Sequence, residues 1–118
     1  MNLLFEILGG VWLAYAAVIL WLVYGRGAFS VVYNPMIAPL IRGAGMQAMT
    51  VGARCYLAHA DARLTPSGLV HETFHYREQW RRRPLTFLPR YFFQLARYGY
   101  DKCPMENEAR VAAGEPAR

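Results

Sequence analysis

The chain has 118 residues, which is enough for one small domain at most. Its hydrophobic content of 55% is high, and its net charge of +5 arises from 13 basic residues, all arginine except Lys102, against 8 acids. Cys55 and Cys103 are too few for a disulfide framework and suit lone thiols in a reducing compartment. No recognised nucleic-acid-binding module accompanies the positive charge, so specific nucleic-acid binding is not expected.

The first predicted element is an apolar helix from Leu3 to Tyr24, in which Glu6 is the one charged residue. About 20 apolar residues span a bilayer, so residues 1–24 are predicted to form a transmembrane helix. A cleaved signal peptide fits less well, because no Lys or Arg precedes the apolar run and no small-x-small site ends it. Arg26 and Arg42 follow the run, so the positive-inside rule predicts a single-pass membrane protein with a cytoplasmic C-terminal part.

Residues 25–47 form a predicted connector that is rich in glycine and proline, with a short strand at residues 29–33. Residues 48–57 carry β-branched and aromatic residues around Gly52, which predicts a further strand. Two interpretations stay open for this strand. It is either purely structural, or its edge pairs with an extended peptide substrate.

The next segment is predicted to be a helix that begins after Thr65, a good N-cap, with Pro66 at its first position. The same pattern lets this helix run to Arg83 and end before Pro84. The run of residues 81–83 is all arginine. It is either a solvated helix end or a contact with anionic lipid headgroups.

This helix carries His71-Glu72-Thr73-Phe74-His75, which reads H-E-x-x-H. Residues four apart share one face of a helix, so His71 and His75 can grip one Zn²⁺ together. Zinc held by three protein ligands keeps a fourth place for water and lowers the pKa of that water to about 7. Glu72 would then act as the general base that takes a proton from this water.

After Pro84, residues 85–98 are predicted to form a second helix, in which Pro89 is tolerable only within the first turn. An apolar stripe at helical spacing predicts core packing, whereas Gln94 falls on another, polar face. A third helix is predicted from Pro104 to Ala113. Glu106 and Glu108 lie in it two residues apart, so both cannot face one metal ion.

The combination of H-E-x-x-H, a following helix and P-x-E-x-E-A resembles the small gluzincin-type zinc metallopeptidases. It is similar to the membrane gluzincins of the CAAX-protease and heat-shock-protease type, whose second motif is E-x-x-A-D. It is most similar to short bacterial and phage membrane proteins that read L-x-x-H-E-x-x-H and then G-Y-x-x-x-P-x-E-x-E-A, which suggests a bacterial or phage origin. The matching residues are Leu69, His71, Glu72, His75, Gly99, Tyr100, Pro104, Glu106, Glu108 and Ala109.

The resemblance covers about Thr50 to Ala113 and implies that Glu106 is the third zinc ligand, with Glu108 as the fallback ligand. It also implies that Ala109 lets two helices approach closely. Arg110 stands where the membrane gluzincins have Asp, so the usual support for a ligand histidine is missing from that position. Tyr100 is a candidate to stabilise a developing oxyanion, although packing is the more ordinary role of such a tyrosine.

These observations predict an α+β, mainly helical chain. An N-terminal transmembrane helix and a connector precede a minimal zincin-like domain at residues 48–113 and a tail at residues 114–118. The predicted activity is zinc-dependent hydrolysis of a peptide or protein substrate at a membrane. The alternative is a non-catalytic membrane protein whose zinc is structural and whose domain binds a protein partner. Structural zinc sites normally close all four positions with Cys or His, which favours the peptidase.

Overall fold

The computed structural model describes residues 2–118. Its elements in chain order are α1 (Leu3–Tyr24), β1 (Ser30–Val32), α2 (Ala38–Gly43), β2 (Ala48–Val51), β3 (Arg54–Leu57), α3 (Pro66–Phe74), the π-helix η1 (His75–Trp80), α4 (Pro84–Tyr98) and α5 (Pro104–Ala112). The chain is therefore mixed α and β and mainly helical, as predicted. The connector contains the short helix α2, which the sequence did not predict.

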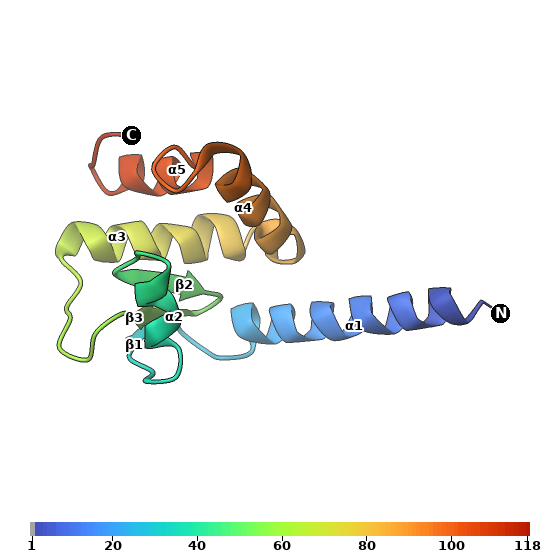
Figure 1. Ribbon diagram of the computed structural model, residues 1–118. Coiled ribbons are helices and arrows are strands. Elements are labelled where there is room, and N and C mark those ends of the chain that lie inside the picture. Colours follow the sequence, from blue (N-terminus) through green and yellow to red (C-terminus); the bar gives the residue numbers. More distant parts are fainter. Residues whose placement is uncertain (1) are drawn as a thin grey trace.

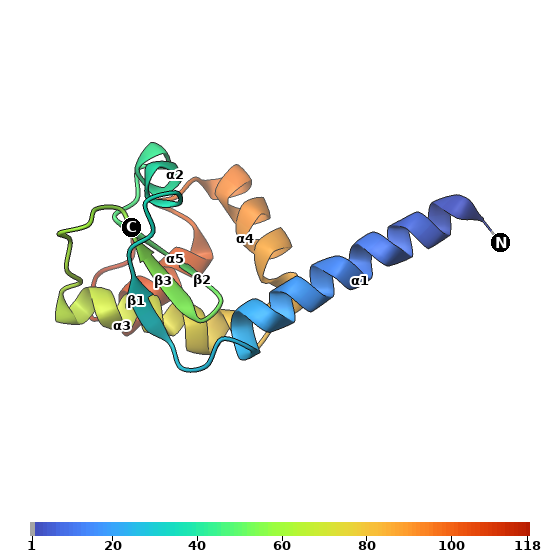
Figure 2. The ribbon, with the colours of Figure 1, turned by 90° about the horizontal axis from the view of Figure 1, so that it is seen from below.

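The domain has three layers, with α3 and η1 in the middle (Figure 1). The small sheet covers one side of this central helix, and α4 and α5 cover the other. Helix α1 projects away from the domain in both views (Figures 1 and 2). The centre of the core is Trp80, which is 1% exposed, stacks on Phe87 at 3.9 Å and donates its indole N–H to the carbonyl of Thr50 at 3.2 Å.

The sheet has the strand order β1-β3-β2, with β1 parallel and β2 antiparallel to β3. The strand predicted at residues 48–57 is wrong in one respect, because the segment folds into a β-hairpin whose Val51 pairs with Arg54. Gly52 makes this tight turn at φ +58°, in the left-handed region that favours glycine. Strand β2 therefore lies at the edge of the sheet within the described chain.

The tip of this hairpin rests on the C-terminal end of α1. Ala53 donates its backbone N–H to the carbonyl of Leu22 at 2.9 Å, which satisfies one of the carbonyls that a helix end leaves unpaired. A Cβ atom at Gly52 would lie 2.4 Å from the same oxygen, so only glycine permits this contact. The sheet and α1 are thus joined directly.

Helix α1 is long and apolar enough to cross a membrane. Residues 3–14 of α1 are exposed on every side, and contact with the domain begins at Tyr15. Further along, Ile19 and Val23 are 3% and 0% exposed and belong to the core with Trp80. The last turns of α1 therefore pack as part of the domain, while the first half stands free.

Helix α4 contains Pro89 well beyond its first turn, contrary to the sequence-based expectation. Proline has no backbone N–H, so it leaves the carbonyl four residues earlier without its helical partner. That carbonyl belongs to Leu85, and the hydroxyl of Tyr15 donates to it at 2.9 Å. A tertiary contact from α1 thus replaces the missing helical hydrogen bond.

The helix predicted to run from Pro66 to Arg83 begins as expected, because Thr65 Oγ1 accepts the N–H of Gly68 at 3.0 Å. The prediction is wrong about the second half of this segment. The α-helical part ends at Phe74, and residues 75–80 form the π-helix η1, whose hydrogen bonds run from residue i to i+5. Such wide turns are frequent at functional sites, and this one begins at a histidine of the H-E-x-x-H motif.

Candidate metal centre

Three side chains from two layers converge between the middle layer and α5. His71 in α3 and His75 at the start of η1 both aim Nε2 at Oε2 of Glu106 in α5, at 3.0 Å and 3.2 Å. The two Nε2 atoms are 3.2 Å apart. Ligands bound tetrahedrally at 2.0–2.1 Å from one ion lie roughly 3.3 Å from one another. The described residues therefore contain a group of three ligand atoms that could hold a metal ion.

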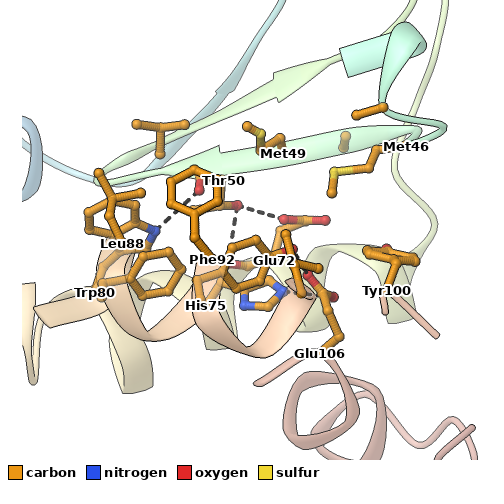
Figure 3. Close-up of a pocket in the computed structure, with 16 residues that line it drawn as sticks. Met46, Met49, Thr50, Glu72, His75, Trp80, Leu88, Phe92, Tyr100 and Glu106 are labelled. Carbon is orange, nitrogen blue, oxygen red and sulfur yellow. Dashed lines mark hydrogen bonds and ion pairs between the residues drawn. The ribbon is translucent and has the colours of Figure 1, made fainter. Parts of the chain in front are cut away.

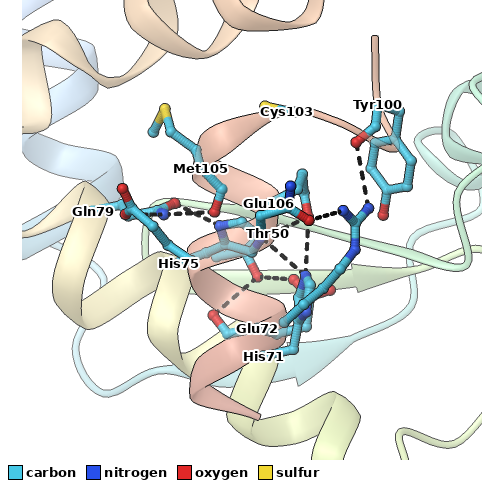
Figure 4. A network of polar contacts seen from close by, with 12 residues as sticks. Thr50, His71, Glu72, His75, Gln79, Tyr100, Cys103, Met105 and Glu106 are labelled. Carbon is cyan, nitrogen blue, oxygen red and sulfur yellow. Dashed lines mark hydrogen bonds and ion pairs between the residues drawn. The ribbon is translucent and has the colours of Figure 1, made fainter. Parts of the chain in front are cut away.

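The hydrogen bonds around His75 favour a cation in this group. Gln79 Nε2 donates to the carbonyl of Met105 at 2.8 Å, which orients the amide so that its Oε1 accepts from His75 Nδ1 at 2.6 Å (Figure 4). A neutral His75 with its proton on Nδ1 presents a bare lone pair at Nε2. That lone pair points at the Glu106 carboxylate, an arrangement that either a metal ion or a second proton on the ring makes favourable.

The pKa shifts of His75 and Glu106 also favour positive charge between these side chains. Burial alone would lower the pKa of His75, but the hydrogen bond and the charge of Glu106 outweigh burial and raise it. Burial alone would raise the pKa of Glu106, but its hydrogen bonds with His71 and His75 hold it well below its usual range. The site is thus built to keep Glu106 ionised beside positive charge.

The second carboxylate oxygen of Glu106 is held separately. Tyr91 in α4 donates its hydroxyl to Oε1 at 2.6 Å, while Oε2 faces the histidines. Burial, and then the charge of Glu106, raise the pKa of Tyr91, so its hydroxyl stays protonated and remains a donor. The sequence pattern places Tyr91 in a packing stripe, and nothing local marks it as a partner of the site.

Glu72 lies beside the ligand group without joining it. Its side chain is buried, and its Oε2 accepts a hydrogen bond from Thr50 Oγ1 at 2.6 Å. Thr50 belongs to the edge strand β2, so the sheet positions this carboxylate (Figures 3 and 4). Sequence reasoning missed Thr50, because its contact with Glu72 depends on how the hairpin packs on α3.

The structure does not bring Glu108 to the histidines. This residue is exposed, and its carboxylate accepts from Gln79 Nε2 at 3.3 Å on the far side of the amide.

Gln79, four residues after His75, is the side chain that holds the ring of His75 in place. The wide turn of η1 places Gln79 over the ring, and the i, i+4 spacing is the sequence signal that could have revealed it.

Arg110 stabilises the fold around the site and makes no hydrogen bond to the histidines in the described structure. It is 2% exposed and donates to the carbonyl of Asp101 and to Oδ1 of Asn107, each at 2.7 Å. Its guanidinium also lies 5.2 Å from the ring centroid of Tyr100. Arg110 therefore fixes the turn that carries Tyr100.

Two cavities adjoin Glu72. An apolar cavity of about 180 Å³ lies between β2 and α4 and is lined by Met49, Leu88 and Phe92, with Glu72 and His75 at its inner end (Figure 3). A more polar cavity of about 460 Å³ lies toward the loop before α3. Glu72 and Tyr100 line both, so the two cavities meet beside the ligand group. Burial, and then the charge of Glu106, raise the pKa of Tyr100, which keeps its hydroxyl protonated.

Comparisons of the chain with protein-family models, with curated proteins and with solved structures find no match. The resemblance to gluzincins therefore stays a prediction.

Proposed function

We propose that the chain is a membrane-anchored, zinc-dependent peptidase whose zinc ligands are His71, His75 and Glu106. The observation that carries the proposal is the convergence of these three ligand atoms beside a carboxylate that is not itself a ligand. Three protein ligands leave one coordination place for water, as in catalytic zinc sites. The two cavities that meet beside Glu72 would give a peptide room on both sides.

In the proposed reaction, bound zinc supplies Lewis acidity, which lowers the pKa of water and polarises a carbonyl. Glu72 takes a proton from the attacking water and passes it to the leaving amine, while Thr50 holds one carboxylate oxygen in place. Tyr100, protonated and at the junction of the cavities, can donate to the developing oxyanion. The free edge of β2 is suited to pair with the extended substrate.

We further infer that α1 anchors this domain and that the domain lies in the cytoplasm. The support is the apolar length of α1 together with Arg26, Arg42 and the arginines at 81–83, all of which follow it.

The experiment compares the full chain in detergent with the variants Glu72→Gln, Glu106→Gln and Glu108→Gln. Wild type and Glu72→Gln are expected to bind one zinc per chain, while Glu72→Gln loses about 10²-fold to 10⁴-fold of the cleavage rate on an unstructured protein. Glu106→Gln is expected to lose zinc. Glu108→Gln is the matched control on the same helix and is expected to keep zinc and activity, because Glu108 lies outside the ligand group.

A second function has one specific observation in its favour. The ligand group joins α5 to the middle layer, so zinc would hold the C-terminal helix on the domain and supply folding free energy. The alternative is a non-catalytic protein that binds a partner and needs zinc only for stability. Full activity in Glu72→Gln would refute the role of Glu72 as the general base, whereas a zinc-bound wild type that cleaves nothing and unfolds when the zinc is removed would favour this alternative.

A further inference from the structure

The free part of α1 is too short to cross a bilayer without help. At about 1.5 Å per residue, the exposed stretch from Leu3 to Ala14 is roughly 18 Å long. The hydrocarbon layer is about 30 Å thick. Any bilayer that α1 crosses must therefore extend along the part of α1 that packs against the domain, from Tyr15 toward Tyr24.

Helix α4 is the element that meets this part of α1. The hydroxyl of Tyr15 donates a hydrogen bond to the carbonyl of Leu85 at the start of α4, and Phe87 shares the core cluster with Ile19. In both ribbon views α4 begins beside α1 and then runs across its direction, on the side of the domain that faces the free end of α1 (Figures 1 and 2). A bilayer around α1 therefore reaches α4 first.

One part of the exposed surface of α4 is apolar. Around the helix, Phe92, Ala96, Pro89 and Phe93 are neighbours, and all four are exposed. Phe92 and Phe93 are 60% and 67% exposed, which is unusual for adjacent phenylalanines of a protein surface. We call these four residues the α4 apolar face.

Positive charge borders the α4 apolar face on one side. Arg90 and Arg97, seven residues apart and both exposed, lie next to Phe93 around the helix. At the end of α1, the guanidinium of Arg81 lies 5.7 Å from the ring centroid of Tyr24. Aromatic residues flanked by arginine are typical of helices that lie in the membrane interface, because the rings enter the acyl layer and the cations reach anionic headgroups.

We propose that α4 is a second membrane-binding element, which lies in the interface with its α4 apolar face in the lipid. This inference rests on the proposed anchoring of α1. The occupant is the lipid bilayer, because α4 begins where a bilayer around α1 must extend and because arginine borders its exposed apolar face. Phe92 also lines the apolar cavity that ends at Glu72. The ligand group would therefore open at the bilayer surface, toward chain segments that emerge from the membrane.

The test places an environment-sensitive fluorophore on single introduced cysteines of the full chain in liposomes of mixed neutral and anionic lipid. Cys55 and Cys103 are buried, so the folded chain offers the label only the introduced thiol, and wild type treated with the same label checks this. Leu13→Cys reports on the free part of α1, and Phe93→Cys reports on the α4 apolar face. Leu69→Cys is the matched control, an exposed leucine on the end of α3 farthest from the free end of α1.

Lipids that carry a quencher in their acyl chains are expected to quench the fluorophore at positions 13 and 93 and to leave position 69 bright. Quenching at 13 without quenching at 93 would overturn the inference and leave the α1 anchor intact. Absence of quenching at 13 would overturn the anchor, and the inference with it. Emission at 93 that is shielded from lipid quencher but self-quenches as the protein concentration rises would show a second copy on this face and overturn the lipid assignment.

Discussion

The substitution Gln79→Leu tests whether the amide of Gln79 prepares His75 for a metal. Gln79 is 6% exposed and holds His75 Nδ1 at 2.6 Å, which fixes the ring orientation and leaves Nε2 free to coordinate. Losing such a partner of a metal-bound histidine typically costs 10-fold to 100-fold in affinity, or about 1.4–2.8 kcal/mol. We therefore expect the zinc Kd of Gln79→Leu to rise by about that factor, measured by competition with a chromogenic chelator.

Gln94→Leu provides the matched control. Gln79 donates to the carbonyl of Met105, and Gln94 Oε1 accepts the N–H of the same residue at 2.9 Å. Each substitution therefore removes one anchor of α5, with a cost of about 1–3 kcal/mol in the free energy of unfolding. Only Gln79 contacts a histidine. If both variants lose the same zinc affinity, docking of α5 explains the loss and the role assigned to Gln79 is refuted.

Other contacts support three more predictions. Tyr15→Phe should lower the free energy of unfolding by about 1–3 kcal/mol in the native sequence but by much less in a Pro89→Ala background. The reason is that alanine at position 89 restores the backbone N–H that pairs with the carbonyl of Leu85. Equal costs of Tyr15→Phe in both backgrounds of a double-mutant cycle would contradict this. In the metal-free chain, the raised pKa of His75 means that this residue stabilises the fold below pH 6.5, and this contribution is lost as the pH rises further. The lowered pKa of Glu106 means that this residue stabilises the fold above pH 4.5, and this contribution is lost as the pH falls further. With chelator present, the melting temperature of wild type should therefore exceed that of Glu106→Gln by the largest margin between pH 4.5 and pH 6.5. A margin that grows toward pH 9 would contradict this prediction. Burial, and then the charge of Glu72, raise the pKa of Cys55 to about 12, so iodoacetamide should modify this thiol at pH 8 only after denaturation, as peptide mass mapping would reveal.

The sequence is most informative where chemistry depends on local spacing. His71 and His75 lie four apart on a capped helix, so their convergence follows from helix geometry, and Glu106 supplies the later acid. The local pattern places Gly52 within a single strand. Its positive φ and its contact with Leu22 turn the segment into a hairpin, and that contact depends on an element distant in the sequence.

The remaining differences also have long-range causes. Pro89 is normally costly inside a helix, and the hydroxyl that compensates for it comes from residue 15 of another helix. Thr50 and Tyr91 carry no local mark of their contacts with Glu72 and Glu106, because the sheet and α4 reach the site only after the chain has folded. The π-helix at residues 75–80 likewise has no simple spacing signal in the sequence.

The contact between Gly52 and Leu22 joins α1 to the edge strand β2. A helix in a bilayer adjusts its tilt to the thickness of the hydrocarbon layer. Because the hairpin tip is hydrogen-bonded to the end of α1, and Trp80 packs on the same last turns of α1, tilting α1 would turn β2 and the middle layer together. Thr50 holds the carboxylate of Glu72. A change of tilt would therefore keep Thr50 aligned with Glu72 and would instead reorient the whole site relative to the bilayer surface.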